Sequence, residues 1–377
     1  MAGSVIILAV DGGGIRGIIP AYILNLIEGS LQKPCYQIFN MIGGTSTGGI
    51  IAAGLSTPQW VNDAYSDPLT AADLFNIYAN DGADIFVLQD SWDFSSEWAK
   101  YYANYQGTGI EPFLQRQVGP STTLLDAKIA MSGFSNVRLQ HMFTTGYAVN
   151  STGGSFADPQ AGIDYGPYLF NWADADNSGD NYFVWEAARG TSAAPSYFPV
   201  AQVGGTNGYN SNANPRWIVD GGTMSNNPAL WGVTEALRTG MASSLADITV
   251  ISLGTGFYPG AAGVDITDNS GDIPGNWGAF PWVLSDLYDL SYNANRGTLL
   301  NIILDAVQNV AAAQLTAMIN GGLTYYRLEP QLAFSQSAMD DYSTANIKSL
   351  VDTTKSYLKN DGNAIYQSII NLLKASF

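Results

Sequence analysis

Apolar residues near the start of the chain form a continuous run that is followed by a helical repeat. Ser4–Val10 (SVIILAV) is rich in β-branched residues and ends in glycines, which is typical of a strand buried on both faces of a parallel sheet. Between Ile18 and Ile27 the apolar residues recur at helical spacing, and Pro20 is tolerated in the first turn of a helix. The pattern predicts a strand, a glycine loop and a helix, in that order.

The same pattern of strand, turn and helix repeats in the next segment. Ile38–Gly44 (IFNMIGG) predicts a short strand, the turn after it holds Ser46, and a stretch of small residues continues as a helix. Further strands are predicted over Ala127–Gly133, Arg138–Gly146 and Asp247–Gly256, spaced among helical stretches. This alternation favours a three-layer α/β/α fold with a central, mostly parallel sheet.

The later segments differ in composition and period. Asn150–Asn181 is rich in Gly, Asp, Asn, Tyr and Ser and has no steady period, which predicts a long surface loop. Helices are predicted over Thr298–Asn320 and Ala345–Ser376, the second with a break near Asn360–Gly362. We expect the C-terminal helices to pack on the same core, because no clear linker divides the chain.

The composition restricts the class of partner. Of the 377 residues 46% are hydrophobic, yet no run of about 18 apolar residues occurs, so we expect no membrane span and only peripheral contact with a membrane or micelle surface. Only 12% of residues are charged, and 15 basic against 32 acidic residues give a net charge of -17. That charge opposes binding to nucleic acid phosphates and to strongly anionic membranes.

The cysteine content and the N-terminus bear on the cellular compartment without deciding it. Cys35 is the only cysteine, which excludes an intrachain disulfide and a cysteine-based metal site. The residues before Asp11 contain no Lys or Arg and only a short apolar run, so we expect no signal peptide. The lack of a leader favours the cytoplasm, whereas the thinly charged, Asn-rich composition also suits a secreted protein. The oligomeric state stays open.

The glycine loop after the first predicted strand is compatible with two functions. Gly12, Gly14 and Gly17 have the G-x-G-x-x-G spacing that cradles a dinucleotide pyrophosphate, and the same loop can bind a developing oxyanion. A dinucleotide site needs an acidic residue at the end of the second strand, about 20 residues beyond the loop. That strand instead ends in Gly43-Gly44-Thr45-Ser46, and Glu28 falls within the predicted helix, which disfavours dinucleotide binding.

The turn after the second predicted strand has the pattern of a nucleophile elbow. Gly44 to Gly48 reads G-x-S-x-G between a strand and a helix, with Ser46 at its centre. The flanking glycines leave room for a strained serine, and the helix N-terminus offers N–H groups to negative charge. An ordinary tight turn is the alternative interpretation. Ser46 is the candidate nucleophile.

A serine nucleophile needs a base, and the chain offers two candidates. His141, the only histidine, precedes the acid candidate, whereas an α/β-hydrolase orders its triad Ser, acid, His, so we interpret His141 as a core or surface residue. Asp220 follows the short predicted strand Trp217–Val219 and precedes two glycines. Its carboxylate can lie at a strand end and act as a general base without imidazole. The alternative at Asp220 is an Asp-Gly-Gly turn.

Four segments together resemble the patatin-like phospholipases. They are, in order, DGGGIRG from Asp11, GTSTGG from Gly44, ARGTSAAPSYFPV over Ala188–Val200, and DGG from Asp220 with SNNPA after it. The blocks span about Val5 to Pro228, which is well over half of the chain. The resemblance implies a patatin-type acyl hydrolase domain over residues 1–335, followed by a helical extension over residues 336–377 on the same core.

The resemblance also implies a lipid acyl hydrolase that uses a Ser-Asp dyad. Ser46 is then the nucleophile and Asp220 the base, and Arg16 stiffens the glycine loop or adds positive potential to it. The glycine loop supplies the oxyanion-hole N–H groups, at Gly12, Gly13 and Gly14. This mechanism requires no metal and no organic cofactor. The substrate is a lipid or a small acyl ester, with the head group and the acyl position left open.

Two other functions remain possible at this point. A storage or lipid-binding protein that keeps the fold without catalysis is one, although the intact Ser46 and Asp220 argue against it. The other is a Ser-His triad esterase, which requires His141 to be essential and Asp220 to be dispensable.

Two further features carry weaker expectations. Four residues have the alternation of a calcium loop, Asp174, Asp176, Ser178 and Asp180. The twelfth position of that loop is Trp185 instead of a glutamate, so we interpret the segment as an acidic surface turn. Four tryptophans are candidates for contact with lipid, with core packing as the alternative: Trp92, Trp98, Trp277 and Trp282.

Overall fold

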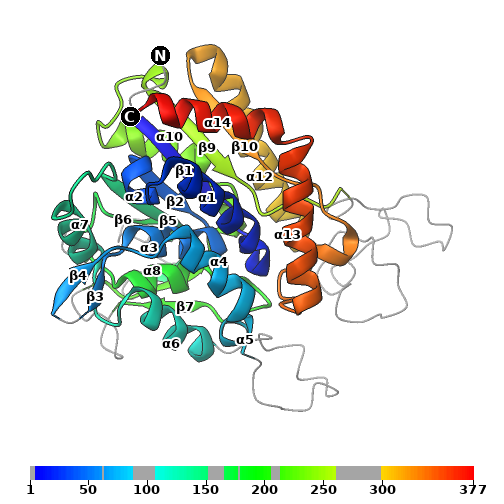
Figure 1. Ribbon diagram of the computed structural model, residues 1–377. Coiled ribbons are helices and arrows are strands. Elements are labelled where there is room, and N and C mark those ends of the chain that lie inside the picture. The colour runs from blue at the N-terminus through cyan, green and yellow to red at the C-terminus, as the bar shows by residue number, and fades with distance from the viewer. Residues whose placement is uncertain are drawn as a thin grey trace, which may run out of the picture.

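The strands assemble into one central sheet (Figure 1). The computed structural model describes residues 5–61, 63–87, 107–151, 165–176, 179–204, 213–259 and 299–377. Among these residues, eight strands form the sheet in the order β10-β9-β1-β2-β5-β8-β7, and β6 also pairs with β5. Their bounds are β1 (Val5–Val10), β2 (Met41–Gly44), β5 (His141–Ser151), β6 (Gly166–Asn171), β7 (Ala201–Val203), β8 (Arg216–Asp220), β9 (Ile248–Leu253) and β10 (Thr324–Leu328). A separate hairpin consists of β3 (Gln59–Val61) and β4 (Ala64–Ser66).

The parallel part of the sheet brings several strand ends to one edge. β10, β9, β1, β2 and β5 run parallel, and the register places Val10 at the end of β1 opposite Gly44 and Leu253. β5 continues beyond this level, and β8 returns antiparallel along it, so that Asp220 lies opposite Gly146. The segments that follow β1, β2 and β8 therefore start close together.

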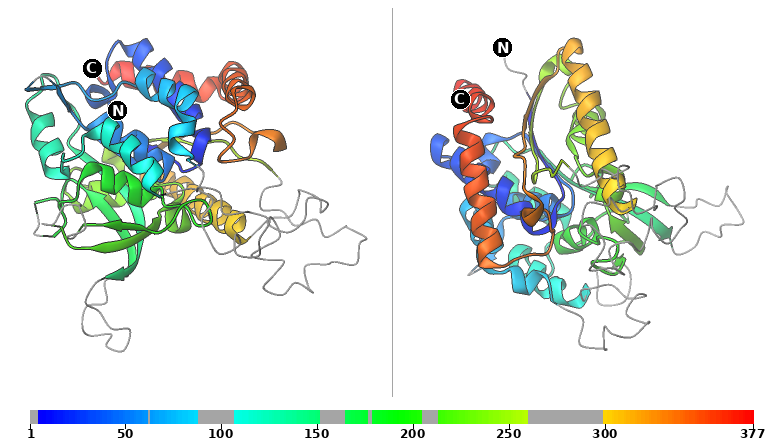
Figure 2. Two further views of the ribbon diagram at one scale, coloured as in Figure 1. Left: turned by 90° about the horizontal axis from the view of Figure 1, so that it is seen from below. Right: turned by 90° about the vertical axis from the view of Figure 1, so that its right-hand side faces the viewer.

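Helices cover both faces of the sheet, and the alternation along β1 decides which face each side chain joins. Leu8 and Val10 belong to a core shared with α1, α3, α13 and α14. Ile7 and Ala9 belong to the opposite core, with α10 and α12. The right-hand view of Figure 2 shows the sheet between these two layers, which confirms the predicted α/β/α fold.

The helices have the following bounds. The longer ones are α1 (Ile18–Leu31), α3 (Thr47–Ser56), α4 (Ala71–Asn80), α6 (Gly107–Val118), α7 (Leu124–Ser132), α8 (Val184–Thr191), α10 (Ala229–Arg238), α12 (Leu299–Met318), α13 (Thr344–Lys359) and α14 (Asn363–Ala375). The short ones are α2 (Cys35–Ile38), α5 (Gly82–Ile85), α9 (Gly222–Ser225) and the 3-10 turns η1 (Gly14–Gly17), η3 (Leu245–Asp247), η5 (Ile319–Gly321) and η6 (Phe334–Gln336).

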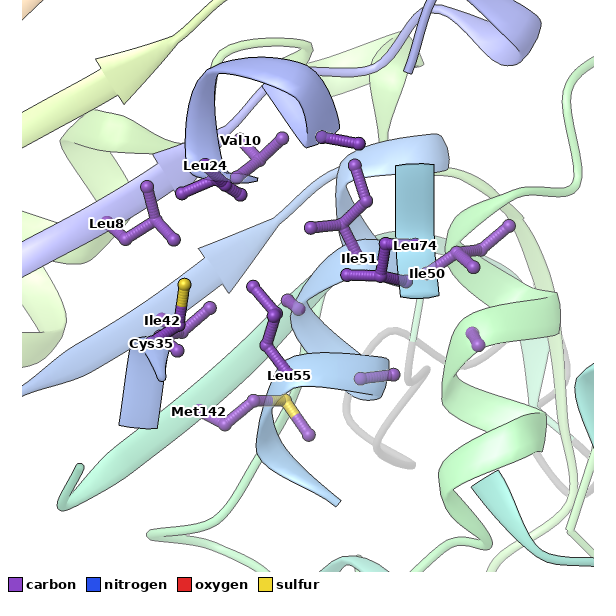
Figure 3. Packing of buried hydrophobic residues seen from close by; sticks show 14 of the residues in the cluster. Leu8, Val10, Leu24, Cys35, Ile42, Ile50, Ile51, Leu55, Leu74 and Met142 are labelled. Carbon is purple, nitrogen blue, oxygen red and sulfur yellow. The ribbon is translucent and has the colours of Figure 1, made fainter. Parts of the chain in front are cut away.

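The larger core lies directly beneath the strand ends. Figure 3 shows Leu8 and Ile42 of the sheet beside Leu24 of α1 and Leu55 of α3, and all four side chains are almost fully buried. Complete burial of one such side chain contributes roughly 1.5–3 kcal/mol. Because β1, β2, α1 and α3 share this core, the two turns that connect them rest on a rigid base.

Two sequence predictions are wrong in detail. Ala127–Gly133 lies mostly in helix α7 and not in a strand, because Thr123 and Asp126 form a capping box and the buried residues of α7 recur at helical spacing. The predicted loop Asn150–Asn181 includes strand β6, which pairs antiparallel with β5. Residues 152–164 and 177–178 of that segment, and all four tryptophans named above, lie outside the described residues. The broken C-terminal helix is confirmed as α13 and α14.

The stretch Ile302–Gly321, most of which is α12, is long and apolar enough to span a membrane by length and composition alone. No such stretch is predicted from the sequence, because polar residues interrupt the apolar run of this segment. α12 packs beside α9 and α10 in this structure, and Leu315 is fully buried in the core that α12 shares with α10.

Candidate active site

The edge where the parallel strands end brings together three predicted groups. Ser46 follows β2, the loop Gly12–Gly14 follows β1, and Asp220 ends β8. All of them line one cavity of about 360 Å³. We expect these groups to act together from the sequence, and in the structure they line the same cavity.

Ser46 lies in a strained turn that only its neighbours make possible. Its backbone has φ 54° and ψ -122°, an uncommon conformation for a residue with a side chain, and costs of this kind are about 1–3 kcal/mol. A Cβ on Gly44 would overlap the carbonyl of Gly48, and a Cβ on Gly48 would overlap the carbonyl of Val10. The two glycines of the G-x-S-x-G pattern therefore allow the close approach of backbone that this turn needs. The Thr191 hydroxyl accepts the Ser46 N–H at 2.9 Å.

Asp220 is buried and has few groups that stabilise its charge. Burial raises the pKa of its carboxyl to about 7, although the Gly222 amide, the Ser46 side chain and the nearby Arg189 all act in the opposite direction. The Gly222 N–H donates to Asp220 Oδ1 at 2.6 Å, and the Ser46 side chain lies close enough to this carboxyl to lower its pKa. A carboxylate with such a pKa, beside a serine, is suited to accept the serine proton near neutral pH.

The loop Gly12–Gly14 lines the cavity, and hydrogen bonds hold two of its carbonyls. The Gly12 carbonyl accepts from Thr255 Oγ1 at 2.6 Å, and the Gly13 carbonyl accepts from the Arg16 backbone at 3.2 Å and from Arg16 Nε at 3.3 Å. Each carbonyl belongs to the same planar, trans peptide as the next N–H. The N–H groups of Gly13 and Gly14 therefore point away from the groups that hold these carbonyls.

The Gly12 N–H differs from the prediction. It donates to the Asn226 carbonyl at 3.1 Å, which removes it from the predicted set of oxyanion donors. In the part of the chain that the structure describes, no acceptor is found for the N–H of Gly13 or Gly14. Gly14 has φ 59°, and a Cβ there would overlap the Met339 carbonyl, so this position requires glycine.

Arg16 holds the loop and lies on the cavity wall. Besides its bond to Gly13, its guanidinium donates to the Gly256 carbonyl at 3.3 Å. Burial lowers the pKa of Arg16 from its ordinary high value. Both suggested roles, stiffening the loop and adding positive potential, are compatible with this position.

The cavity is lined by both apolar and polar side chains. The apolar residues include Ile50, Ile85, Phe86, Ile110 and Phe198. The polar residues include Thr223, Asn226, Asp305 and Gln308. Such a mixed lining fits a substrate that has both an apolar chain and a polar group.

His141 lies at the opposite end of the sheet. It opens β5, pairs with Met41 at the start of β2, and is buried. Its Nε2 is 3.1 Å from Glu235 Oε2. Burial opposes the charge of Glu235, but hydrogen bonds from His141 and Arg238 outweigh it and lower the pKa of Glu235 to about 2. The arrangement that a Ser-His triad requires is not formed.

Several residues of the site were not singled out from the sequence. Thr191 and Asn226 lie within the blocks ARGTSAAPSYFPV and SNNPA. These blocks indicate a part in the site, but the sequence does not reveal the individual contacts of the two residues. Thr255, Gln308 and Met339 belong to segments without any motif. The contacts of Thr255 and Met339 with the glycine loop, and of Gln308 with Asn226, depend on the tertiary fold.

The acidic turn shows ion pairs and hydrogen bonds within the protein. Asp174 pairs with Arg238 at 3.0 Å, Asp176 lies 3.6 Å from Lys128, and Asp180 accepts from Tyr168 at 2.9 Å. Ser178 lies outside the described residues. Among the residues that are described, no group of three or more His, Cys, Asp or Glu side chains is arranged to hold a metal ion.

Comparison with known proteins gives a consistent family. The family model described as "Patatin-like phospholipase" matches residues 8–230. The chain is 27% identical to "Patatin-like protein 2" of Arabidopsis thaliana over 94% of this chain and 83% of that protein. It is 26% identical to "Patatin group D-2" of Solanum tuberosum, with 94% and 84% covered.

Two further matches complete the comparison. The Solanum tuberosum protein named "Probable inactive patatin-3-Kuras 1" is 27% identical, over 94% of this chain and 86% of that protein. Among solved structures, VipD from Legionella pneumophila matches with a TM-score of 0.35 and 10% identity, over 94% of this chain and 67% of that chain.

Proposed function

The chain belongs to the patatin-like phospholipase family, and we propose that it cleaves acyl esters of lipids through Ser46, Asp220 and an acyl-enzyme intermediate. Membership supports lipid acyl hydrolysis in general, but one relative carries the word inactive in its name, so the residues must support the chemistry. The observation that carries the proposal is the strained Ser46 beside a buried carboxylate, in the same cavity as Gly13 and Gly14, whose N–H groups have no acceptor among the described residues.

The first half of the reaction forms the acyl-enzyme. Ser46 Oγ attacks the ester carbonyl carbon while its proton passes to the Asp220 carboxylate. The carbonyl oxygen becomes an oxyanion that accepts hydrogen bonds from the N–H groups of Gly13 and Gly14. When the carbonyl re-forms, the bond to the alcohol breaks, and the alcohol leaves with the proton held by Asp220.

The second half of the reaction releases the acid. A water molecule attacks the acyl carbon as Asp220 takes its proton, and the same two N–H groups hold the second oxyanion. Breakage of the bond to Ser46 Oγ returns the proton to serine and frees the carboxylic acid. Asp220 acts as base and acid in turn, so the cycle needs no imidazole.

The substrate lies with its acyl chain against the apolar residues of the cavity. Ile50, Phe86 and Phe198 face that chain, and the alcohol part faces Thr223 and Asp305. A net charge of -17 opposes approach to strongly anionic lipid, so neutral or zwitterionic lipids are the expected substrates. The head group and the acyl position cut are left open by this argument.

A lipid surface contacts the aromatic rim of the cavity. Phe257 and Phe334 are 40% and 49% exposed, and Tyr258 packs on Phe334 with 5.6 Å between ring centroids. Rings at such a rim are suited to the boundary between water and lipid. Phe334→Ser should lower hydrolysis of phosphatidylcholine vesicles several-fold and leave that of a soluble ester unchanged. Equal losses on both substrates would contradict this contact.

Release of p-nitrophenol from a medium-chain ester tests the proposal. Wild type should be active, and Ser46→Ala should lose more than about a thousandfold. His141→Ala, checked for folding, is the matched control and should stay within about twofold of wild type. An essential His141 would restore the triad esterase, and an inactive, folded wild type would support a lipid-binding protein without catalysis.

A further inference from the structure

A closed ring of hydrogen bonds and one peptide link lies behind the glycine loop. Asp11, directly before Gly12, is fully buried, and Arg327 of β10 donates to its Oδ2 at 2.6 Å. Arg327 also donates to Glu329 Oε2 at 2.7 Å. The Gln308 amide of α12 in turn donates to Glu329 Oε1 at 2.7 Å. These contacts join the first strand to the opposite helix layer.

The remaining contacts return the ring to the loop. Asn226 Nδ2 donates to Gln308 Oε1 at 2.9 Å, and the Asn226 backbone carbonyl accepts the Gly12 N–H at 3.1 Å. Gly12 is bonded covalently to Asp11, where the ring began. Each hydrogen bond of the ring has a typical donor–acceptor distance. The position of the Gly12 peptide is therefore determined from both of its ends.

We propose that Arg327, Glu329 and Gln308 are positioning residues for the oxyanion hole. Oxyanion donors must lie within about 0.3 Å of their best distance, because stabilisation depends on donors at 2.7–3.1 Å from the developing charge. Gly12 precedes the two donors Gly13 and Gly14, so a shift of Gly12 moves both. Because Gln308 also lines the cavity, the ring links the substrate wall on α12 to the loop.

The ring also has an electrostatic role. Asp11 is one residue from the loop, and a negative charge there would oppose the oxyanion. Arg327 is partly buried between Asp11 and Glu329 and compensates that charge. Burial raises the pKa of Asp11 to about 7, and Arg327 acts against this shift. A neutral replacement for Arg327 would leave a buried acid without its partner.

The three proposed residues lie beyond the part of the chain that the family model matches. That match ends at residue 230, whereas Gln308, Arg327 and Glu329 all follow it. Asp11, Gly12 and Asn226 lie inside it. The ring therefore connects the matched segment to the C-terminal part of the chain, which supplies half of its members.

The catalytic test rests on the proposed function and compares two glutamines of one helix. Gln308→Leu breaks two links of the ring, and Gln314→Leu makes the same change at an exposed position of α12. We expect Gln308→Leu to lower kcat for the p-nitrophenyl ester by about ten- to a hundredfold with KM within about twofold. Gln314→Leu should match wild type. Equal kcat values in the two variants would overturn the proposal.

Coupling between ring members distinguishes positioning from general loss of structure. Asn226→Ala removes the amide that bonds Gln308 but keeps the backbone carbonyl that holds Gly12. The double variant Gln308→Leu/Asn226→Ala should lose no more kcat than the single variant with the larger loss, because both substitutions break the same ring. Losses that multiply would contradict a shared path. Glu329→Gln, which keeps the shape, provides a second variant if Gln308→Leu fails to fold.

Hydrogen–deuterium exchange tests the ring without any activity. The peptide that covers residues 9–17 should exchange several-fold faster in Gln308→Leu or Glu329→Gln than in Gln314→Leu, because the Gly12 N–H loses its fixed acceptor. Unchanged exchange in both ring variants would overturn the proposal. An inactive wild type, together with faster exchange in the ring variants, would instead contradict the proposed function and leave the ring supported.

Discussion

Two buried carboxyl groups at opposite ends of the sheet have pKa values shifted in opposite directions. Asp220, beside Ser46, has a pKa raised to about 7 because burial dominates and its partners are few. Glu235, beside His141, has a pKa lowered to about 2 because hydrogen bonds from His141 and Arg238 outweigh burial. α10 begins near Asn226 and carries Glu235 almost two turns along, away from the site.

The comparison shows that the more familiar catalytic pair is the structural one. A histidine beside a carboxylate resembles part of a triad, yet His141 and Glu235 lie at the end of the sheet away from Ser46. Asp220 forms no ion pair within the described residues, and its raised pKa suits proton transfer near neutral pH. Insufficient compensation of its charge is what makes Asp220 a candidate base.

Replacing each carboxylate by its amide should give the largest difference in kcat between the two sites. Asp220→Asn should lower kcat for ester hydrolysis at least a hundredfold, since general base catalysis contributes about 10²–10⁴-fold. Glu235→Gln, a matched change, should keep kcat within about twofold. Steady-state kinetics of both variants at pH 8 give the answer, and similar losses in the two would remove the distinction between these ends of the sheet.

The pH dependence of hydrolysis shows which of the two carboxyl groups acts as the base. Asp220 must be ionised to accept a proton, so kcat/KM should rise with pH through about 7 and level off above it. The rate near pH 6 should be about one tenth of that near pH 8. Glu235→Gln should give the same profile. A profile without a change near pH 7, measured on an ester stable over this range, would assign the base elsewhere.

Stability should change in opposite directions in the two variants. The raised pKa of Asp220 means that the cost of its buried charge is absent below about pH 4 and complete above about pH 7. Asp220→Asn should therefore raise the free energy of unfolding at pH 8 by on the order of 1 kcal/mol. The lowered pKa of Glu235 stabilises the fold above about pH 4.5, and this contribution is lost as pH falls through about 2.

Glu235→Gln should accordingly lower the free energy of unfolding at pH 7 by about 1–3 kcal/mol. Denaturant titrations of both variants and wild type at pH 4 and pH 8 measure these differences. A loss of stability in Asp220→Asn at pH 8 would contradict the view that its charge is poorly compensated.

The sequence was sufficient for the residues that lie in local patterns. The buried run of β1, the elbow around Ser46 and the helical spacing of α1 each depend on neighbours within a few residues, and all three are observed. The prediction of a strand over Ala127–Gly133 is wrong because a capping box at Thr123 and Asp126 stabilises a helix there.

Contacts between distant segments could not be predicted in the same way. The occupied N–H of Gly12 depends on Asn226, more than two hundred residues away in the chain. Nothing in the local sequence of Gln308 or Arg327 points to the glycine loop. The acidity of Asp220 follows from burial, which a single sequence does not reveal.

Covalent labelling with a fluorophosphonate, followed by mass spectrometry of the intact protein and its peptides, identifies the nucleophile and its base. We expect one adduct per chain, located on Ser46, in wild type and in His141→Ala. Asp220→Asn should react at least about a hundredfold more slowly. An adduct on another residue, or a labelling rate that depends on His141 and not on Asp220, would exclude the Ser46–Asp220 mechanism.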